Sequence, residues 1–263
     1  MENAPSLKVR IKSTAAYIAA AVLLIVLTVF ARKIDGAYFS SGTLFKPAEM
    51  TVEAAMILFA GLFALKHRES GIMKRIRSHL IYIAVPLVTV FAARFFLPDR
   101  ILPLPHNLIH ILDIFLSAFS DDLVLCALGC ILLIHKGGLK RSGVFIMLIC
   151  MVVYEAVLAE ETAAELVFSI VAVALLGFFE IQLHLSAESA VFCAVFHFII
   201  RLCIELPAHN TAQNEPFFGS AASNALHFAA LLTMLLLGSI LYARRREKDL
   251  IDNAEDYSKS QRT

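Results

Sequence analysis

Long runs of apolar residues, each close to the length needed to cross a bilayer, recur along this chain from one end to the other. The hydrocarbon core of a bilayer is about 30 Å thick, and a helix that crosses it needs roughly 20 mostly apolar residues. About eight windows of the sequence approach that length. They are 15–31, 51–65, 80–97, 109–134, 144–159, 162–183, 189–206 and 222–242.

These runs are continuously apolar, whereas the strands of a membrane β-barrel alternate between apolar and polar residues. The sequence therefore predicts an all-α, polytopic integral membrane helical bundle of about eight transmembrane helices. We expect a single transmembrane helical domain over residues 1–243. Residues 244–263 are strongly polar and are expected to form a short cytoplasmic tail.

The composition excludes several classes of protein. Hydrophobic residues make up 59% and charged residues 17% of the chain, whereas an ordinary soluble domain is nearer half apolar and a quarter charged. This balance excludes a soluble globular enzyme and a disordered chain. The net charge of +1 provides no basic field for a phosphate backbone, so no nucleic-acid partner is expected. The five cysteines all lie in apolar stretches and indicate no secreted disulfide framework.

Lysine and arginine residues cluster at alternate connections between the expected spans. Cytoplasmic loops retain such residues, so their distribution predicts orientation. The clusters lie at 8–12, 66–77, 136–141 and 244–248. An even number of spans places all of them, and both termini, on the cytoplasmic side. The expected location is the bacterial cytoplasmic (inner) membrane, with the lipid bilayer as the surroundings and another membrane protein as an alternative partner.

A stripe of polar side chains follows the helix expected after Pro105. An ionisable group in the bilayer costs about 2.5–3.5 kcal/mol on insertion scales, so it should face protein or water. At 100° per residue, an arc of about 80° holds His106, His110, Asp113 and Asp121, whereas Asp122 points nearly the opposite way. The stripe predicts an inward-facing polar site. Alternatively, the segment lies flat in the headgroup layer.

Metal binding is a second interpretation of the beginning of this stripe. His106 and His110 are separated by four residues, a spacing that lets two imidazoles meet one ion, and Asp113 could supply a third ligand. The residues identify no cofactor.

Further ionisable side chains occur in the later spans. Around the turn between the fifth and sixth spans they are Glu155, Glu160, Glu161 and Glu165. Carboxylates this close together favour proton uptake or cation binding, unless the turn is simply a solvated loop. Glu180 and His184, near the inner end of the sixth span, are interpreted as an interfacial polar pair rather than a site.

The seventh and eighth spans complete the set. His197, Arg201 and Glu205 follow one another at intervals of four residues, on one side of a helix. An arginine within lipid is expected to pair with a carboxylate, so we expect Arg201 to pair with Glu205. Asn224 and His227 lie near the outer end of the eighth span.

Together these groups predict one polar cavity that opens to the outside of the cell. Its expected lining is His106, His110, Asp113, Asp121, Glu155, Glu161, Glu165, His197, Arg201, Glu205, Asn224 and His227. Such a cavity favours a small transporter, channel or permease component that moves protons, cations or a polar solute. The alternatives are an intramembrane hydrolase and a non-catalytic scaffold or regulatory subunit of a larger complex.

The paired Glu160 and Glu161, followed by His197 and then His227, resemble the CPBP (CAAX-protease and bacteriocin-processing) family of intramembrane proteases. The motifs of that family are EExxxR, FxxxH and HxxxN on successive helices, and the resemblance covers residues from about 150 to 235. It implies one of the two glutamates as general base, with the two histidines orienting water or holding the oxyanion. The chain departs from the motifs at Glu165, Cys193 and Leu231, which replace the Arg, Phe and Asn.

Overall fold

The computed structural model describes residues 5–38, 46–66, 79–80, 82–86, 88, 104–159, 163–211 and 221–260. For 65–66, 104–107, 163–165, 203–211, 221–227 and 249–260 it describes the backbone only. Within these ranges every element is a helix, as predicted. The elements are α1 (Leu7–Tyr38), α2 (Pro47–Lys66), α4 (Leu104–Asp121), the π-helical segments η1 (Asp122–Ala127) and η2 (Cys130–Lys136), α5 (Lys140–Leu158), α6 (Ala163–Ala187), α7 (Ala190–Thr211) and α8 (Ala221–Ser260).

Within the described residues, six helical stretches are long and apolar enough to cross a membrane. Their outer surfaces are apolar as well: Leu62 is 70% exposed, Phe145 66% and Leu236 64%. Such a surface suits lipid and not water. The stretches are Leu7–Tyr38, Pro47–Ala64, Leu108–Lys136, Lys140–Leu158, Leu166–Ala187 and Phe228–Lys248. The chain therefore has the construction of a multi-pass integral membrane protein.

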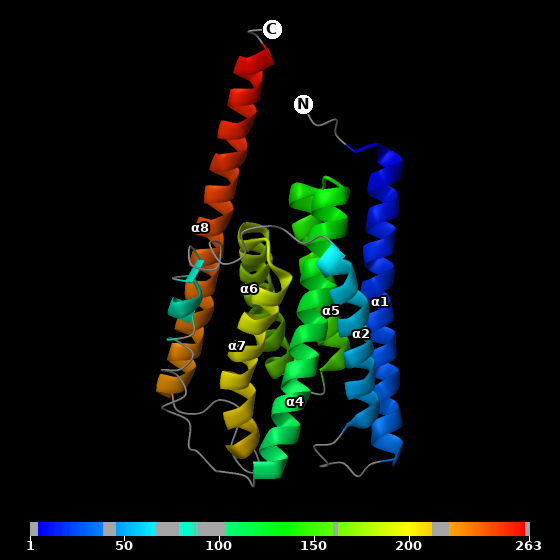
Figure 1. Ribbon diagram of the computed structural model, residues 1–263. Coiled ribbons are helices and arrows are strands. Elements are labelled where there is room, and N and C mark those ends of the chain that lie inside the picture. The colour runs from blue at the N-terminus through cyan, green and yellow to red at the C-terminus, as the bar shows by residue number, and fades with distance from the viewer. Residues whose placement is uncertain are drawn as a thin grey trace.

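Two of the expected spans are not among these six. Most of 80–97 lies outside the described residues. The span at 189–206 corresponds to α7, whose apolar part is described over Ala190–Leu202 and is shorter. The count of eight spans and the cytoplasmic position of the termini therefore stay predictions. The start of α1 and the end of α8 lie at the same end of the bundle (Figure 1).

One helix occupies the centre of the bundle. The helical backbone continues from α4 into η1 at Asp121 (φ −63°, ψ −51°) and through Gly129 (φ −60°, ψ −48°) into η2. Helices α1, α2, α5, α6 and α7 all contact this central helix (Figure 1). Every residue of η1 is buried. The arrangement favours a spanning helix over one that lies flat in the headgroup layer.

The central helix ends in a turn built on glycine. Gly138 has φ +64°, a conformation that costs glycine little. Its backbone N–H donates to the Ile134 carbonyl at 3.0 Å, and the Leu139 N–H donates to the Leu133 carbonyl at 2.9 Å. These two bonds satisfy carbonyls at the end of η2, and the left-handed backbone of Gly138 reverses the chain into α5.

Helix α8 extends past its apolar part. Its candidate span ends at Lys248, but the helix continues to Ser260 and projects beyond the rest of the bundle (Figure 1). The segment expected as a polar tail is therefore helical.

Candidate functional site

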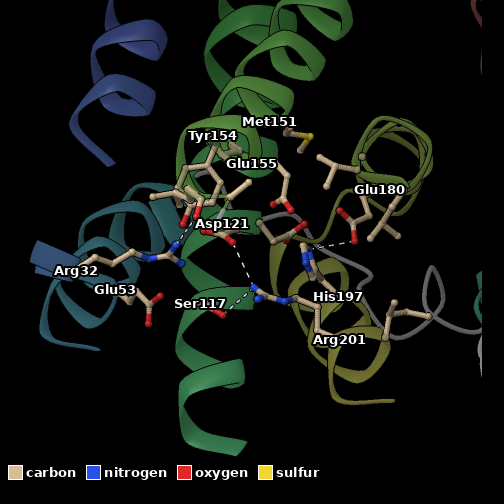
Figure 2. A pocket seen from close by; sticks show the side chains of 18 residues that line it. Arg32, Glu53, Ser117, Asp121, Met151, Tyr154, Glu155, Glu180, His197 and Arg201 are labelled. Atoms are coloured by element: carbon tan, nitrogen blue, oxygen red, sulfur yellow. Dashed lines mark hydrogen bonds and ion pairs between the residues drawn. The ribbon is translucent and has the colours of Figure 1, made fainter. Parts of the chain in front are cut away.

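A cavity of about 500 Å³ lies beside the central helix where α4 continues into η1 (Figure 2). Residues from α1, α2, α4, η1, α5, α6 and α7 line it. The ionisable side chains in the lining are the carboxyl groups of Glu53, Asp121, Asp122, Glu155 and Glu180, the guanidinium groups of Arg32 and Arg201, and the imidazole of His197. The lining therefore holds more acidic than basic groups.

Arg201 connects α7 to the central helix. Its Nη1 donates to Ser117 Oγ at 2.7 Å and lies 3.4 Å from Asp121 Oδ2 (Figure 2). The side chains of Arg201 and Asp121 are 25% and 14% exposed, so water screens this ion pair only in part. These contacts reach across to α4. The pairing of Arg201 with Glu205 stays a prediction, because the Glu205 side chain is outside the described set.

Asp122, Glu180 and His197 form a compact cluster contributed by η1, α6 and α7. One potential ligand atom from each lies within 4.8 Å of the other two. His197 Nδ1 is 3.1 Å from Glu180 Oε1 (Figure 2). Asp122 and Glu180 are only 1% and 2% exposed. Neither carboxylate oxygen of Asp122 has a hydrogen-bond partner within the described part of the chain.

The tight turn between α6 and α7 explains why Glu180 and His197 meet. Helix α6 ends at Ala187, Glu188 adopts φ 53°, and α7 begins at Ala190. Ser189 Oγ accepts a hydrogen bond from the Phe192 N–H at 3.3 Å, which caps the start of α7. Glu180 and His197 lie at similar distances along the two helices from this turn, so an antiparallel pair places them at the same depth.

Arg32 closes the cavity on the side of α1. Its Nε donates to Glu49 Oε1 on α2 at 2.7 Å, and its Nη1 donates to the Leu158 carbonyl at 2.8 Å. Leu158 is the last residue of α5, where carbonyl oxygens lack partners within the helix. Arg32 therefore ties three helices together. Glu53, one turn after Glu49, is 1% exposed, and its Oε2 has no hydrogen-bond partner among the described residues.

The structure brings together only part of the predicted site. Among the predicted cavity residues, Asp121, Glu155, His197 and Arg201 do line the cavity. His110 and Asp113 are described on α4 but are not in its lining. The remaining side chains lie outside the described set, namely those of His106, Glu160, Glu161, Glu165, Glu205, Asn224 and His227.

Neither the protease resemblance nor the metal site expected at the start of α4 has all of its side chains within the described set. The glutamate pair and the second histidine of the protease resemblance lie outside the described side chains. His106 of the expected metal site is not described either. Within the described part of the chain, the three-residue group with metal-ligand spacing is instead Asp122, Glu180 and His197.

Several residues of the site were not expected. The interpretation of Glu180 and His184 as an interfacial pair is wrong, because they are 2% and 6% exposed and Glu180 lines the cavity. Asp122 was placed on the face opposite the site, but it belongs to a helix that is buried on all sides. Glu53 and Arg32 were also missed. One usable signal was the similar spacing of Glu180 and His197 from the α6–α7 turn.

Comparison of the chain with protein-family models, with curated proteins and with solved structures finds no match.

Proposed function

We propose that this protein is a small transporter, channel or permease component whose buried cavity takes up protons or cations. The observation that carries the proposal is the composition of the cavity lining, in which five carboxyl groups face two guanidinium groups and one imidazole. The surrounding helices are apolar on their outer surfaces. A polar interior within an apolar exterior is typical of membrane proteins that move charged or polar solutes.

Electrostatics favours a positively charged occupant. An ionised carboxylate buried without a partner is costly, and it is stabilised by a proton, a metal ion or a cationic side chain. Arg201 and Arg32 are already engaged, with Asp121 and Glu49 respectively. Asp122 and Glu53 are buried and retain oxygens without hydrogen-bond partners among the described residues. Asp122, which lies beside Glu180 and His197, is therefore suited to bind a cation that enters the cavity. Glu53, which lies outside that group, is suited to take up a proton.

The proposed location is a bacterial cytoplasmic membrane, with the cavity reached from outside the cell. A cysteine introduced at Glu155, in the cavity lining, tests the side of access. In a background in which the native cysteines are replaced by alanine, we expect a membrane-impermeant thiol reagent to label it in intact cells. Labelling only in inverted vesicles would contradict the proposed direction.

Flux across liposomes tests the function itself. We expect the purified full-length protein to conduct protons or metal cations above the rate of protein-free liposomes. Asp121→Asn and Glu53→Gln should each lower this flux at least about tenfold, because each removes a carboxylate from the lining. Glu247→Gln is the matched control, since Glu247 is exposed on α8. Equal flux in all variants, or none in the wild type, would reject the proposal.

A further inference from the structure

We infer that Asp122, Glu180 and His197 bind one divalent transition-metal ion. This inference rests on the proposed function, and it names the class of cation that binds in the cavity. The three residues come from η1, α6 and α7, so the site depends on the packing of three separate segments.

The geometry is that of ligands around an ion. Two ligands bound at about 2.0–2.1 Å to a tetrahedral Zn²⁺ are separated by about 3.3 Å. His197 Nδ1 and Glu180 Oε1 are 3.1 Å apart, close to this separation. Apart from this contact, neither atom has a hydrogen-bond partner among the described residues. The imidazole nitrogen and the carboxylate oxygen are therefore not committed to any further described group.

Asp122 supplies an independent indication of a ligand. Its side chain is 1% exposed, it lines the cavity, and both of its oxygens lack hydrogen-bond partners within the described residues. Buried carboxylates are ordinarily paired or coordinate metal ions. One ligand atom of Asp122 already lies within 4.8 Å of the other two ligand atoms.

The charges balance when a dication is bound. Two carboxylates and a neutral imidazole carry two negative charges, which a divalent cation neutralises inside a poorly solvated interior. Arg201 would repel a cation, but its Nη1 is directed to Ser117 and Asp121 on α4. The printed contacts of Arg201 thus lie outside the cluster, and those of Arg32 are with Glu49 and Leu158.

The donor set selects the kind of metal. An imidazole nitrogen suits Zn²⁺ and the neighbouring transition metals, whereas Ca²⁺ and Mg²⁺ prefer sites made of oxygen alone. Three protein ligands leave a coordination position for water, as in zinc sites that exchange ligands, whereas structural zinc sites have four protein ligands. An ion held by this set can therefore be exchanged through the cavity.

Metal binding to the purified full-length protein in detergent tests this inference. After treatment with a chelator and removal of the chelator, we expect one equivalent of Zn²⁺ or Co²⁺ per chain, measured by equilibrium dialysis and elemental analysis. Bound Co²⁺ should give the visible absorption of a nitrogen- and oxygen-ligated site. Ca²⁺ and Mg²⁺ at the same concentration should not displace it. Absence of a stoichiometric ion in the wild type overturns the inference.

Variants locate the ion. We expect Asp122→Asn and Glu180→Gln each to weaken Zn²⁺ binding at least about tenfold. Glu53→Gln removes a carboxylate of the same cavity that lies outside the cluster, and should change Zn²⁺ affinity less than about threefold. Equal weakening by all three variants would overturn the inference, since it would indicate diffuse attraction by the acidic lining. If a variant fails to fold, the wild-type stoichiometry and the Co²⁺ spectrum still decide.

The same variants separate this inference from the proposed function. Loss of flux in Glu53→Gln with intact Zn²⁺ binding supports both. Stoichiometric Zn²⁺ binding without any flux would support the metal site and reject the transport function. Flux of protons or alkali cations in a protein that binds no Zn²⁺ would support the transport function and reject the metal site.

Discussion

Replacement of Arg201 by methionine should destabilise the protein more than replacement of its partner Asp121 by asparagine. Both changes remove the ion pair between α7 and α4, in which the charged atoms are 3.4 Å apart. Arg201→Met also removes the 2.7 Å hydrogen bond to Ser117. In addition, it deletes a positive charge from a lining with excess acid, whereas Asp121→Asn relieves repulsion among the carboxylates. The two residues of this ion pair therefore contribute unequally to the stability of the protein.

The magnitudes follow from the distance and the partial exposure. At an effective dielectric constant near 20, unit charges at 3.4 Å attract by about 5 kcal/mol. The desolvation cost offsets most of this energy, because the side chains are only 25% and 14% exposed. We expect a coupling energy of about 1–2 kcal/mol in the double-mutant cycle. Arg201→Met alone should cost about 3–4 kcal/mol, and Asp121→Asn alone about 1 kcal/mol.

The chain is suited to a thiol-based unfolding assay. It has no tryptophan, but Cys126, Cys130 and Cys193 are each 0% exposed. A dye that fluoresces on reaction with thiols therefore reports thermal unfolding in detergent. At about 2–4 °C per kcal/mol, Arg201→Met should lower the midpoint by about 6–16 °C and Asp121→Asn by about 2–4 °C.

A second cycle, between Arg32 and Asp121, serves as the control. Arg32 contacts Glu49 and the Leu158 carbonyl, so its coupling to Asp121 should be below about 0.5 kcal/mol. The reasoning is refuted if Arg201→Met is no more damaging than Asp121→Asn. It is also refuted if both cycles show the same coupling.

Three further changes test the packing by the same thermal assay. Gly129→Ala should cost about 1–3 kcal/mol, because its new Cβ would lie 2.9 Å from the Tyr17 ring; Gly61→Ala, which meets nothing within 4 Å, should be neutral or stabilising. Tyr17→Phe should cost about 1 kcal/mol, since the buried hydroxyl donates to the Leu125 carbonyl at 2.8 Å; an unchanged midpoint would contradict this role. Asp35→Ala should cost about 1–2 kcal/mol, because its carboxylate accepts two backbone N–H groups of the first turn of α2, at 3.1 and 2.9 Å; Asp35→Asn should lose less.

The sequence predicted the membrane helices well because their signal is local. Apolar runs over 15–31, 109–134 and 144–159 each contain enough information to specify a spanning helix, and the structure has candidate spans there. The polar stretch after 243 was predicted only as a tail, because hydropathy does not measure helix propensity. The helix continues through Ser260 although the segment after Lys248 is polar, so hydropathy marks the end of the span and not the end of the helix.

The site was harder to predict because it depends on contacts between distant segments. A helical wheel assigns an inner and an outer face, and this assumption excluded Asp122. The assumption fails for a helix surrounded by protein, which only the three-dimensional packing reveals. Arg201 was correctly expected to face the interior. The described contacts of its guanidinium, however, lie on α4, and no periodicity within α7 identifies Ser117 as a partner.

Helix α8 extends beyond the rest of the bundle, so a spectroscopic probe at its end would report changes in its tilt. The twelve residues between Lys248 and Ser260 extend the transmembrane rod by about 18 Å. If the helix tilts as a rigid rod, each 10° change in tilt displaces the tip by about 3 Å relative to Lys248. A spin label or fluorophore at that tip would convert small rearrangements of the buried helices into measurable changes of distance, without any probe inside the bundle.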